Sequence, residues 1–144
     1  MKMETNNLPN KEKIQALLEK EELVAVYLFG SRAEGTANEQ SDYDFGILFD
    51  SSAKMDDIAV ALLELEERMT DILNSEVDVV LLNTASIEQK YMVISQGVLI
   101  YSKNEDERTD FEDIAIKEYL DFKPFLEIYH KEVKEAIKEG DFYA

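Results

Sequence analysis

Four short apolar runs constrain what this chain can fold into. Each run is rich in β-branched and aromatic residues, a composition typical of buried strands. Between the second and third runs, and again between the third and fourth, apolar residues recur at helical spacing. This alternation of strands and helices predicts an α/β (α+β) fold built on one sheet. The four runs are Leu23–Phe29, Tyr43–Phe49, Val77–Leu82 and Val98–Ser102.

The segments between the runs contain signals for where helices begin and end. Asn10 is expected to cap a helix that continues to about Lys20. A longer helix is expected over Asp56–Leu73, and another from Ile87 to a stop at Gly97, in the C′ position. The polar stretch 31–41 predicts a short helix or a loop, in which the Ser41 hydroxyl would cap a turn.

The C-terminal part, about 104–139, is predicted to be a helical tail. Thr109 and Glu112 have the spacing of a capping box, and Pro124 is expected to kink or split the helix. An aromatic stripe over 111–129 predicts packing, either within the chain or against a partner. A length of 144 residues predicts one domain, with its core at about 10–102.

The charge of the chain limits the classes of molecule that it is expected to bind. With 15 Lys and Arg against 32 Asp and Glu, the net charge is −17. Phosphate contacts dominate affinity for nucleic-acid backbones, so direct nucleic-acid binding is not expected. The acidic surface fits either simple solubility or a partner with a basic surface. His130, the only histidine, is assigned no role.

The cellular compartment is predicted from three features that the sequence does not contain. No apolar run approaches the length of roughly 20 residues that spans a bilayer, so no membrane association is expected. The polar start at 1–10 has no apolar signal-peptide core, which predicts a cytoplasmic protein. The sequence contains no cysteine, and this excludes disulfides, thiolate metal ligands and cysteine nucleophiles.

Gly30 and Ser31 directly follow the first apolar run. A glycine there allows the backbone to approach a ligand closely, since no Cβ is in the way. If a helix starts at Ser31, its free N–H groups and positive dipole end suit a phosphate, and the hydroxyl adds a donor. Arg32 would neutralise phosphate charge, or alternatively form a surface salt bridge.

Three acids accompany the second and third runs. Asp42 and Asp44 are two residues apart at the start of the second run, so both carboxylates face one side. Asp78 is an acid within the apolar third run, and is either functional or a strand-end residue facing water. If the two strands are neighbours, the three carboxylates form a cluster. Such a cluster suits Mg²⁺, in a site of two metal ions for phosphoryl or nucleotidyl transfer.

Gly30-Ser31, ten residues and then Asp42-Tyr43-Asp44 resemble the Gly-Ser…Asp-x-Asp signature of the polymerase-β-like nucleotidyltransferase superfamily. The resemblance implies a small mixed sheet flanked by helices, with a C-terminal helical tail. It also implies that the Gly-Ser pair binds a triphosphate and that the paired acids bind Mg²⁺. Asp78 is assigned the role of third acid, both as metal ligand and as possible general base.

The short length and the tail at 118–124 resemble the minimal nucleotidyltransferase antitoxins that are paired with HEPN-domain ribonuclease toxins. The resemblance implies an enzyme that transfers AMP from ATP to a tyrosine hydroxyl of the toxin. Glu34 departs from many relatives, which have a basic residue at this position. Two alternatives remain: a small-molecule nucleotidyltransferase of the aminoglycoside type, and an antitoxin that binds its toxin without catalysis.

Overall fold

The protein is described by a computed structural model of residues 7–35, 38 and 42–139. A four-stranded sheet forms its centre, in the order β3-β2-β1-β4. Strand β2 pairs antiparallel with β1 and parallel with β3, while β1 pairs antiparallel with β4, so the sheet is mixed as predicted. The strands are β1 (Leu23–Phe29), β2 (Tyr43–Phe49), β3 (Val77–Leu81) and β4 (Val98–Ser102).

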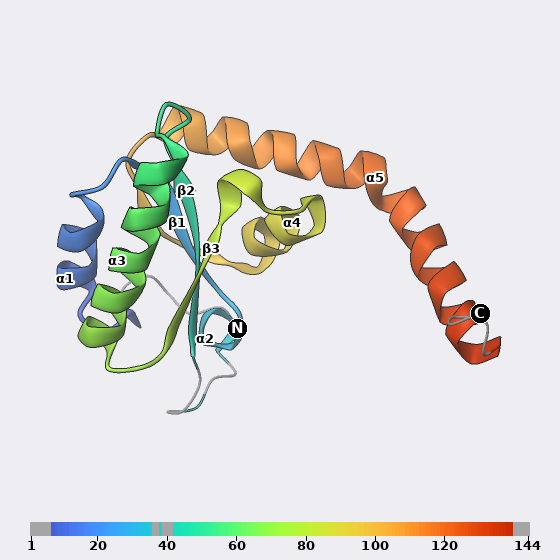
Figure 1. Cartoon of the computed structure of the whole chain (residues 1–144), viewed down its shortest axis with the longest axis horizontal. Coiled ribbons are helices and arrows are strands. Elements are labelled where there is room, and N and C mark those ends of the chain that lie inside the picture. The colour runs from blue at the N-terminus through green and yellow to red at the C-terminus, as the bar shows by residue number, and fades with distance from the viewer. Residues whose placement is uncertain (1–6, 36–37, 39–41, 140–144) are drawn as a thin grey trace.

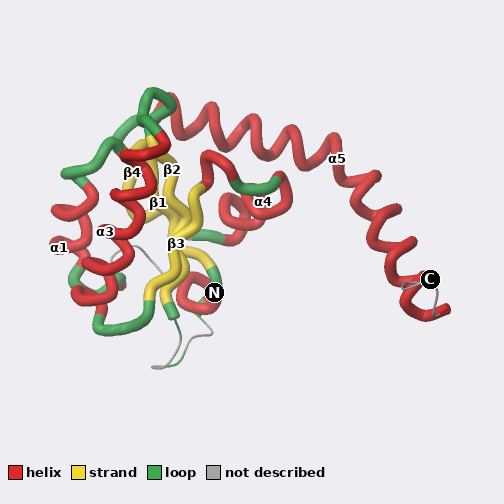
Figure 2. Tube along the Cα trace, in the orientation of Figure 1, coloured by secondary structure: helices red, strands yellow, loops and turns green. Residues whose placement is uncertain are grey.

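Helices cover both faces of the sheet (Figures 1 and 2). Helices α1 and α3 lie on one side, and α4 and α5 lie on the other. The short helix α2 follows β1 directly, and a 3-10 turn, η2, follows β3. The helices are α1 (Lys11–Leu18), α2 (Ser31–Glu34), α3 (Met55–Leu73), α4 (Ile87–Gln96) and α5 (Glu105–Glu139), with η2 at Leu82–Thr84.

Strand β2 separates two apolar cores, because its side chains alternate between the two faces. Tyr43, Phe45 and Ile47 belong to the core under α1 and α3. Leu48 belongs to the core under α4, where a Cβ added to Gly46 would lie 3.0 Å from Val93. Asp44, Gly46 and Leu48 are spaced two residues apart on β2, so the side chain of Asp44 also faces the α4 side.

Several helix ends differ from the prediction. Asn10 precedes α1 in a left-handed conformation (φ 55°), and its side chain makes no capping bond but donates to the Ile72 carbonyl. Helix α4 does stop before Gly97, whose φ of −79° needs no glycine; a Cβ there would collide with the Val93 carbonyl. Leu82 belongs to η2 rather than to the third strand. The predicted Ser41 cap lies outside the described residues.

The capping box predicted at the start of the tail is wrong. Helix α5 begins at Glu105, where the side chain of Asn104 accepts a hydrogen bond from the Glu107 N–H. Thr109 is therefore inside the helix, and its hydroxyl donates back to the Glu105 carbonyl. The helix continues through Pro124, and Figure 1 shows that its second half takes a new direction, as a kink requires.

A polar contact attaches the start of α5 to the middle of β1. The Tyr27 hydroxyl donates to the Glu112 carboxylate at 2.6 Å, and Arg108 donates to the same carboxylate at 2.9 Å. Burial raises the pKa of Tyr27, and the hydrogen bond to Glu112 adds to the effect. Among the described helices, none is both long and apolar enough to cross a membrane.

Two leucines of α3 provide a matched test of the core. The side chain of Leu65 is fully buried, whereas that of Leu63 on the same helix is 70% exposed. We expect Leu65→Ala to lower the free energy of unfolding by about 2–5 kcal/mol, because it leaves a cavity. We expect Leu63→Ala to change it by less than about 0.5 kcal/mol. Urea unfolding followed by circular dichroism measures both, and equal losses would contradict this assignment of the core.

Candidate functional site

The three predicted acids lie at one end of the sheet, where β1 ends and β2 and β3 begin. Asp44 is paired in register with Asp78 on β3 and with Phe29 on β1. Asp42 directly precedes β2 and is exposed, Asp44 is half-buried, and Asp78 is exposed. The parallel pairing of β2 and β3 therefore brings together two acids that are more than thirty positions apart in the chain.

The Gly30-Ser31 turn faces the same acids. Gly30 has a φ of +76°, and a Cβ built on it would lie 2.5 Å from the Asp44 Oδ2 atom. The carboxylate thus occupies the space that any other side chain at this position would take. The Gly30 carbonyl accepts the N–H groups of Ala33 and Glu34, so a helical turn starts here. In general, the N–H groups at the start of a helix have no acceptor within the helix, which is why such turns suit phosphates.

The acids influence one another electrostatically. Partial burial raises the pKa of Asp44 above its ordinary value, and the charges of Asp78 and Asp42 raise it further. Both neighbouring carboxylates are thus close enough to disfavour the ionised form of Asp44. A cation between them would reverse this effect, because it favours the charged form of each carboxylate.

The donor set fits Mg²⁺ better than a metal held by protein alone. In the part of the chain that the structure describes, no three acidic, histidine or cysteine side chains are arranged closely enough to hold a metal ion. Mg²⁺ does not require such a cage, since one or two carboxylates commonly bind it together with waters and substrate phosphates. The metal-binding roles of Asp42, Asp44 and Asp78 remain predictions.

Arg32 contacts an aromatic ring of β2. Its guanidinium carbon lies 4.3 Å from the centroid of the Tyr43 ring, a cation–π distance. Tyr43 is buried in the core under α1 and α3, on the face of β2 opposite to Asp44. Tyr43 was not predicted from the sequence as a contact of Arg32, and no sequence pattern marks such a pair. The phosphate contact assigned to Arg32 remains a prediction.

Two readings of Asp78 were left open by the sequence, a functional acid or a strand-end residue facing water. Its side chain is exposed, near the start of an edge strand. It is therefore accessible from solvent and also adjacent to Asp44. An acid with both properties can reach a substrate as well as a shared cation.

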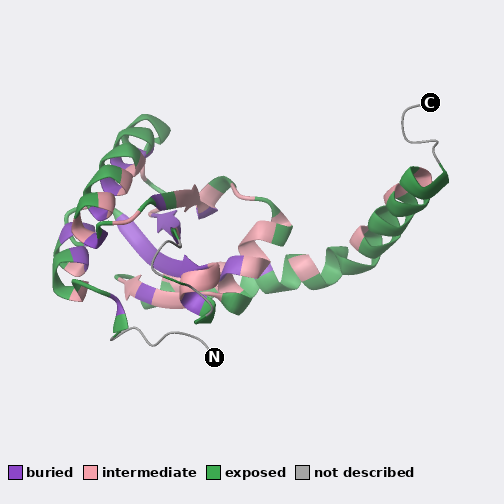
Figure 3. Ribbon diagram, turned by 90° about the horizontal axis from the view of Figure 1, so that it is seen from below, coloured by how far each residue is buried: buried purple, intermediate pink, exposed green. Residues whose placement is uncertain are grey.

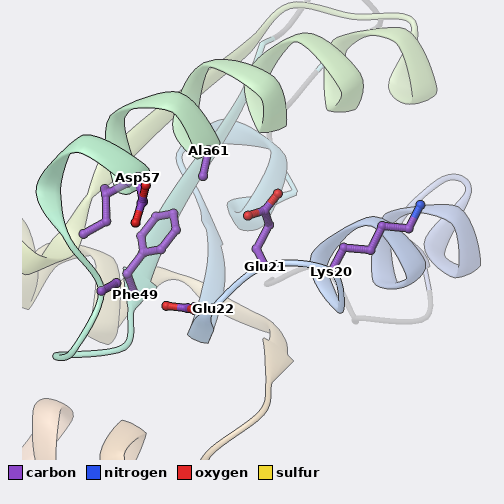
Figure 4. A pocket seen from close by; sticks show the side chains of 8 residues that line it. Lys20, Glu21, Glu22, Phe49, Asp57 and Ala61 are labelled. Carbon is purple, nitrogen blue, oxygen red and sulfur yellow. The ribbon is translucent and has the colours of Figure 1, made fainter.

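A pocket elsewhere in the molecule does not belong to this site. It lies between α3, the segment after α1 and the end of β2, and is lined by Lys20, Glu21, Glu22, Phe49 and Asp57, among others (Figure 4). Strand β1 begins at this end of the sheet, whereas the acids lie where β1 ends. Three of the five named side chains are acidic, so the pocket does not suit a phosphate, and we assign it no role.

Comparison with known proteins defines the family. The profile of the family described as "Polymerase beta, Nucleotidyltransferase" matches residues 12–106, which include the Gly-Ser turn and all three acids. The chain belongs to this nucleotidyltransferase family. It is similar to the protein adenylyltransferase MntA of Shewanella oneidensis, with 34% identity over 100 residues, which cover 68% of this chain and 69% of MntA. The resemblance inferred from the sequence is therefore confirmed.

Solved structures agree with this placement. A toxin–antitoxin structure with AMP-PNP matches with a TM-score of 0.72 and 28% identity, over 87% of this chain and 98% of the other. The MNT antitoxin complex with a tri-AMPylated Shewanella oneidensis HEPN toxin matches with a TM-score of 0.65 and 26% identity, over 87% and 96% of the two chains. The predicted fold, a mixed sheet with flanking helices and a helical tail, is confirmed.

The raised pKa of Asp44 predicts a dependence of stability on pH. A folded-state pKa above the ordinary value means that stability is lost as the pH rises through the folded pKa. In metal-free buffer near neutral pH we expect Asp44→Asn to be more stable than the wild type. The difference should disappear below a pH of about 4, where the wild-type carboxyl is protonated in both states.

Asp50 provides the control, because its pKa is lowered by hydrogen bonds from the backbone and hydroxyl of Ser52. We expect Asp50→Asn to be less stable than the wild type near neutral pH, which is the opposite sign. Urea unfolding across a pH series measures both variants. A loss of stability in Asp44→Asn would contradict repulsion among the three acids.

Proposed function

We propose that this chain is an antitoxin that transfers AMP from ATP to a tyrosine hydroxyl of a partner HEPN-domain ribonuclease, in a reaction that depends on Mg²⁺. One observation carries the proposal: the Gly30 backbone lies against Asp44, and Asp78 is in register beside it. A turn suited to phosphate and a set of carboxylates thus lie together at one end of the sheet. The similarity to MntA, a protein adenylyltransferase, supports AMP as the transferred group.

We assign each residue one task in this reaction. The backbone at Gly30 and the N–H and hydroxyl of Ser31 bind the triphosphate of ATP. Asp42, Asp44 and Asp78 are the residues that would hold Mg²⁺, in one or two ions. When bound, Mg²⁺ would neutralise charge that develops on the phosphates and on the departing pyrophosphate. Arg32 contributes positive charge near the turn.

In the proposed transfer step, every bond formed is matched by a bond broken, and the proton has an acceptor. The oxygen of the partner's tyrosine forms a bond to the α-phosphorus of ATP, and the bond between that phosphorus and the pyrophosphate oxygen breaks. The tyrosine proton moves to Asp78, which is exposed and can accept it as a general base. The products are an adenylylated tyrosine and pyrophosphate. A modified partner would then be unable to act as a ribonuclease.

The surface charge and the known complexes support a protein acceptor. The net charge of −17 favours association with a basic protein, and RNA-cleaving proteins need basic surfaces to hold their substrates. Related chains occur in structures with HEPN toxins, one of which is tri-AMPylated. We also propose that the chain acts in the cytoplasm as one domain, with its core at about 10–102.

The proposal predicts Mg²⁺-dependent labelling of the partner. The chain would be incubated with α-labelled ATP, Mg²⁺ and a HEPN-domain protein encoded beside its gene. We expect label on the partner, and a fall of about 10³-fold in rate for Asp42→Ala or Asp44→Ala, because metal-ion stabilisation contributes several kcal/mol. Asp50→Ala, at the far end of β2, serves as the matched control and should label at the wild-type rate. Chelation of the metal should abolish labelling.

Three outcomes would reject the proposal. If neither the wild-type chain nor any variant labels the partner, the chain does not adenylylate that partner. If label moves to an aminoglycoside or another small hydroxyl compound without a partner, the chain is a small-molecule nucleotidyltransferase. If an Asp42→Ala/Asp44→Ala double variant protects cells from the toxin as well as the wild type does, neutralisation needs binding alone.

The close approach at Gly30 gives a second prediction. Gly30→Ala adopts a positive φ with strain of about 1–3 kcal/mol and also displaces the Asp44 carboxylate. Gly35 has nearly the same φ, +77°, so Gly35→Ala controls for backbone strain. We expect Gly30→Ala to bind AMP-PNP at least about tenfold more weakly, a loss of about 1.4 kcal/mol, because the added methyl displaces Asp44 and alters the turn. Calorimetric titration measures both, and equal binding by the two variants would contradict a triphosphate site at this turn.

A further inference from the structure

The second half of helix α5, residues 122–139, is called the distal arm here. Of the 11 large hydrophobic side chains that are exposed in the described part of the chain, eight lie on α5. Only Ala115 of this helix is buried. The eight are Ile114, Ile116, Leu120, Phe122, Phe125, Ile128, Tyr129 and Ile137. Exposed apolar surface of this extent on one element indicates an interaction surface.

One apolar seam connects the arm to the body of the protein. Its residues follow one another at alternating steps of four and three, the spacing of a helix face that packs on another helix. At the near end Ala115 is buried, and the Tyr119 ring stacks on that of Tyr91 of α4 with 3.8 Å between centroids. The seam consists of Ala115, Tyr119, Phe122, Leu126, Tyr129 and Val133.

Beyond Tyr119 the same seam continues into solvent. The side chains of Phe122 and Tyr129 are 49% and 62% exposed, while Leu126 and Val133 of the same seam are half-buried. The arm also has a polar contact with the body, between His130 and Glu88 of α4 at 3.8 Å. A packing face that is used over its first part and exposed over the rest is an interface that the chain alone leaves incomplete.

The apolar surface of the arm is wider than the seam. Phe125 is 68% exposed, and Ile128 is also exposed on the neighbouring side of the helix. The opposite face is polar and includes Lys123, Glu127 and Lys131, so the arm is an amphipathic helix whose apolar face is uncovered. An isolated helix gains little stability from propensity alone, so packing against another molecule is the expected source of stability for this arm.

The arm lies on the same side of the sheet as the carboxylate of Asp44. Figures 1 and 3 both show the arm extending past the sheet and α4. Asp44 faces the α4 side of β2, as do Gly46 and Leu48. A molecule bound along the arm therefore lies on the same side as the carboxylates.

The charge of the whole chain, rather than that of the arm, indicates the occupant. The arm itself has four Lys and four Glu. A second copy would nevertheless bring another net charge of −17, and six acids lie in the first nine positions of α5, outside the arm. Repulsion between like surfaces disfavours self-association, whereas a basic partner is attracted. The alternating seam is the pattern that a helix of the partner matches. The six acids are Glu105, Asp106, Glu107, Asp110, Glu112 and Asp113.

We propose that the distal arm is the docking surface for the protein substrate: a basic, helical partner that packs along the seam and thereby presents its acceptor hydroxyl to the Asp44 edge. This inference rests on the proposed adenylyl transfer to a protein. The arm supplies affinity for the partner, and the Gly30 turn supplies affinity for the nucleotide. The two affinities are therefore separable by mutation.

The test removes the seam without touching the nucleotide site. Phe122→Ser and Tyr129→Ser are made singly and together, and Leu63→Ser, an equally exposed apolar position on α3, is the matched control. The HEPN-domain protein encoded beside the gene is the partner. We expect the double variant to raise the KM for the partner by about 30-fold or more, the loss typical of interface aromatic anchors. Its Kd for AMP-PNP and that of Leu63→Ser should equal the wild-type value.

The outcomes separate the two proposals. If the wild type does not label the partner at all, adenylyl transfer to that protein fails, whatever the arm does. If the wild type labels the partner and the double variant has an unchanged KM, the arm is not the docking surface. If the wild type alone sediments as a dimer that the double variant loses, the occupant is a second copy, which overturns the inference. The single variants decide the question if the double variant is misfolded, since both side chains are exposed.

Discussion

The pairing of β2 with both of its neighbours is the constraint on which the site depends. Through it Asp44 lies opposite Phe29 on one side and opposite Asp78 on the other. A shift of one residue in β2 would move every side chain to the other face of the sheet. Such a shift would place Phe45 and Ile47, which are fully buried under α1 and α3, on the wrong side. The two cores thus fix the register, and the register places the acids together.

The same arrangement carries an electrostatic cost. Asp44 is partly removed from water beside two other carboxylates, and its pKa is raised in consequence. A protein selected only for stability would not place an acid there, because ionisation of that group opposes folding at neutral pH. Under the proposed function this cost would be offset when a cation binds, since the same carboxylates attract a cation while they repel one another. The repulsion among the acids would then favour the metal-bound state.

Some features could be predicted from residues in sequence order and others could not. The strand runs and the Gly-Ser and Asp-x-Asp spacing are local, and the strands were found where the sequence indicated, apart from Leu82 at the end of the third. The neighbourhood of Asp44 and Asp78 depends on the strand order β3-β2-β1-β4, which periodicity does not encode. The cap of α5 was missed, because the spacing of Thr109 and Glu112 indicated a later start than Glu105, where Asn104 caps the helix. The contact of Arg32 with Tyr43 has no sequence signature.

The separation of the second half of α5 from both cores has a consequence for how such proteins diversify. None of its residues belongs to either apolar cluster of the sheet. Substitutions there are expected to leave the folding free energy almost unaffected. With the docking role proposed for this arm, recognition of the partner could change without loss of catalysis. Duplicated pairs within one cell could then become specific for their own partners through changes in a single helix.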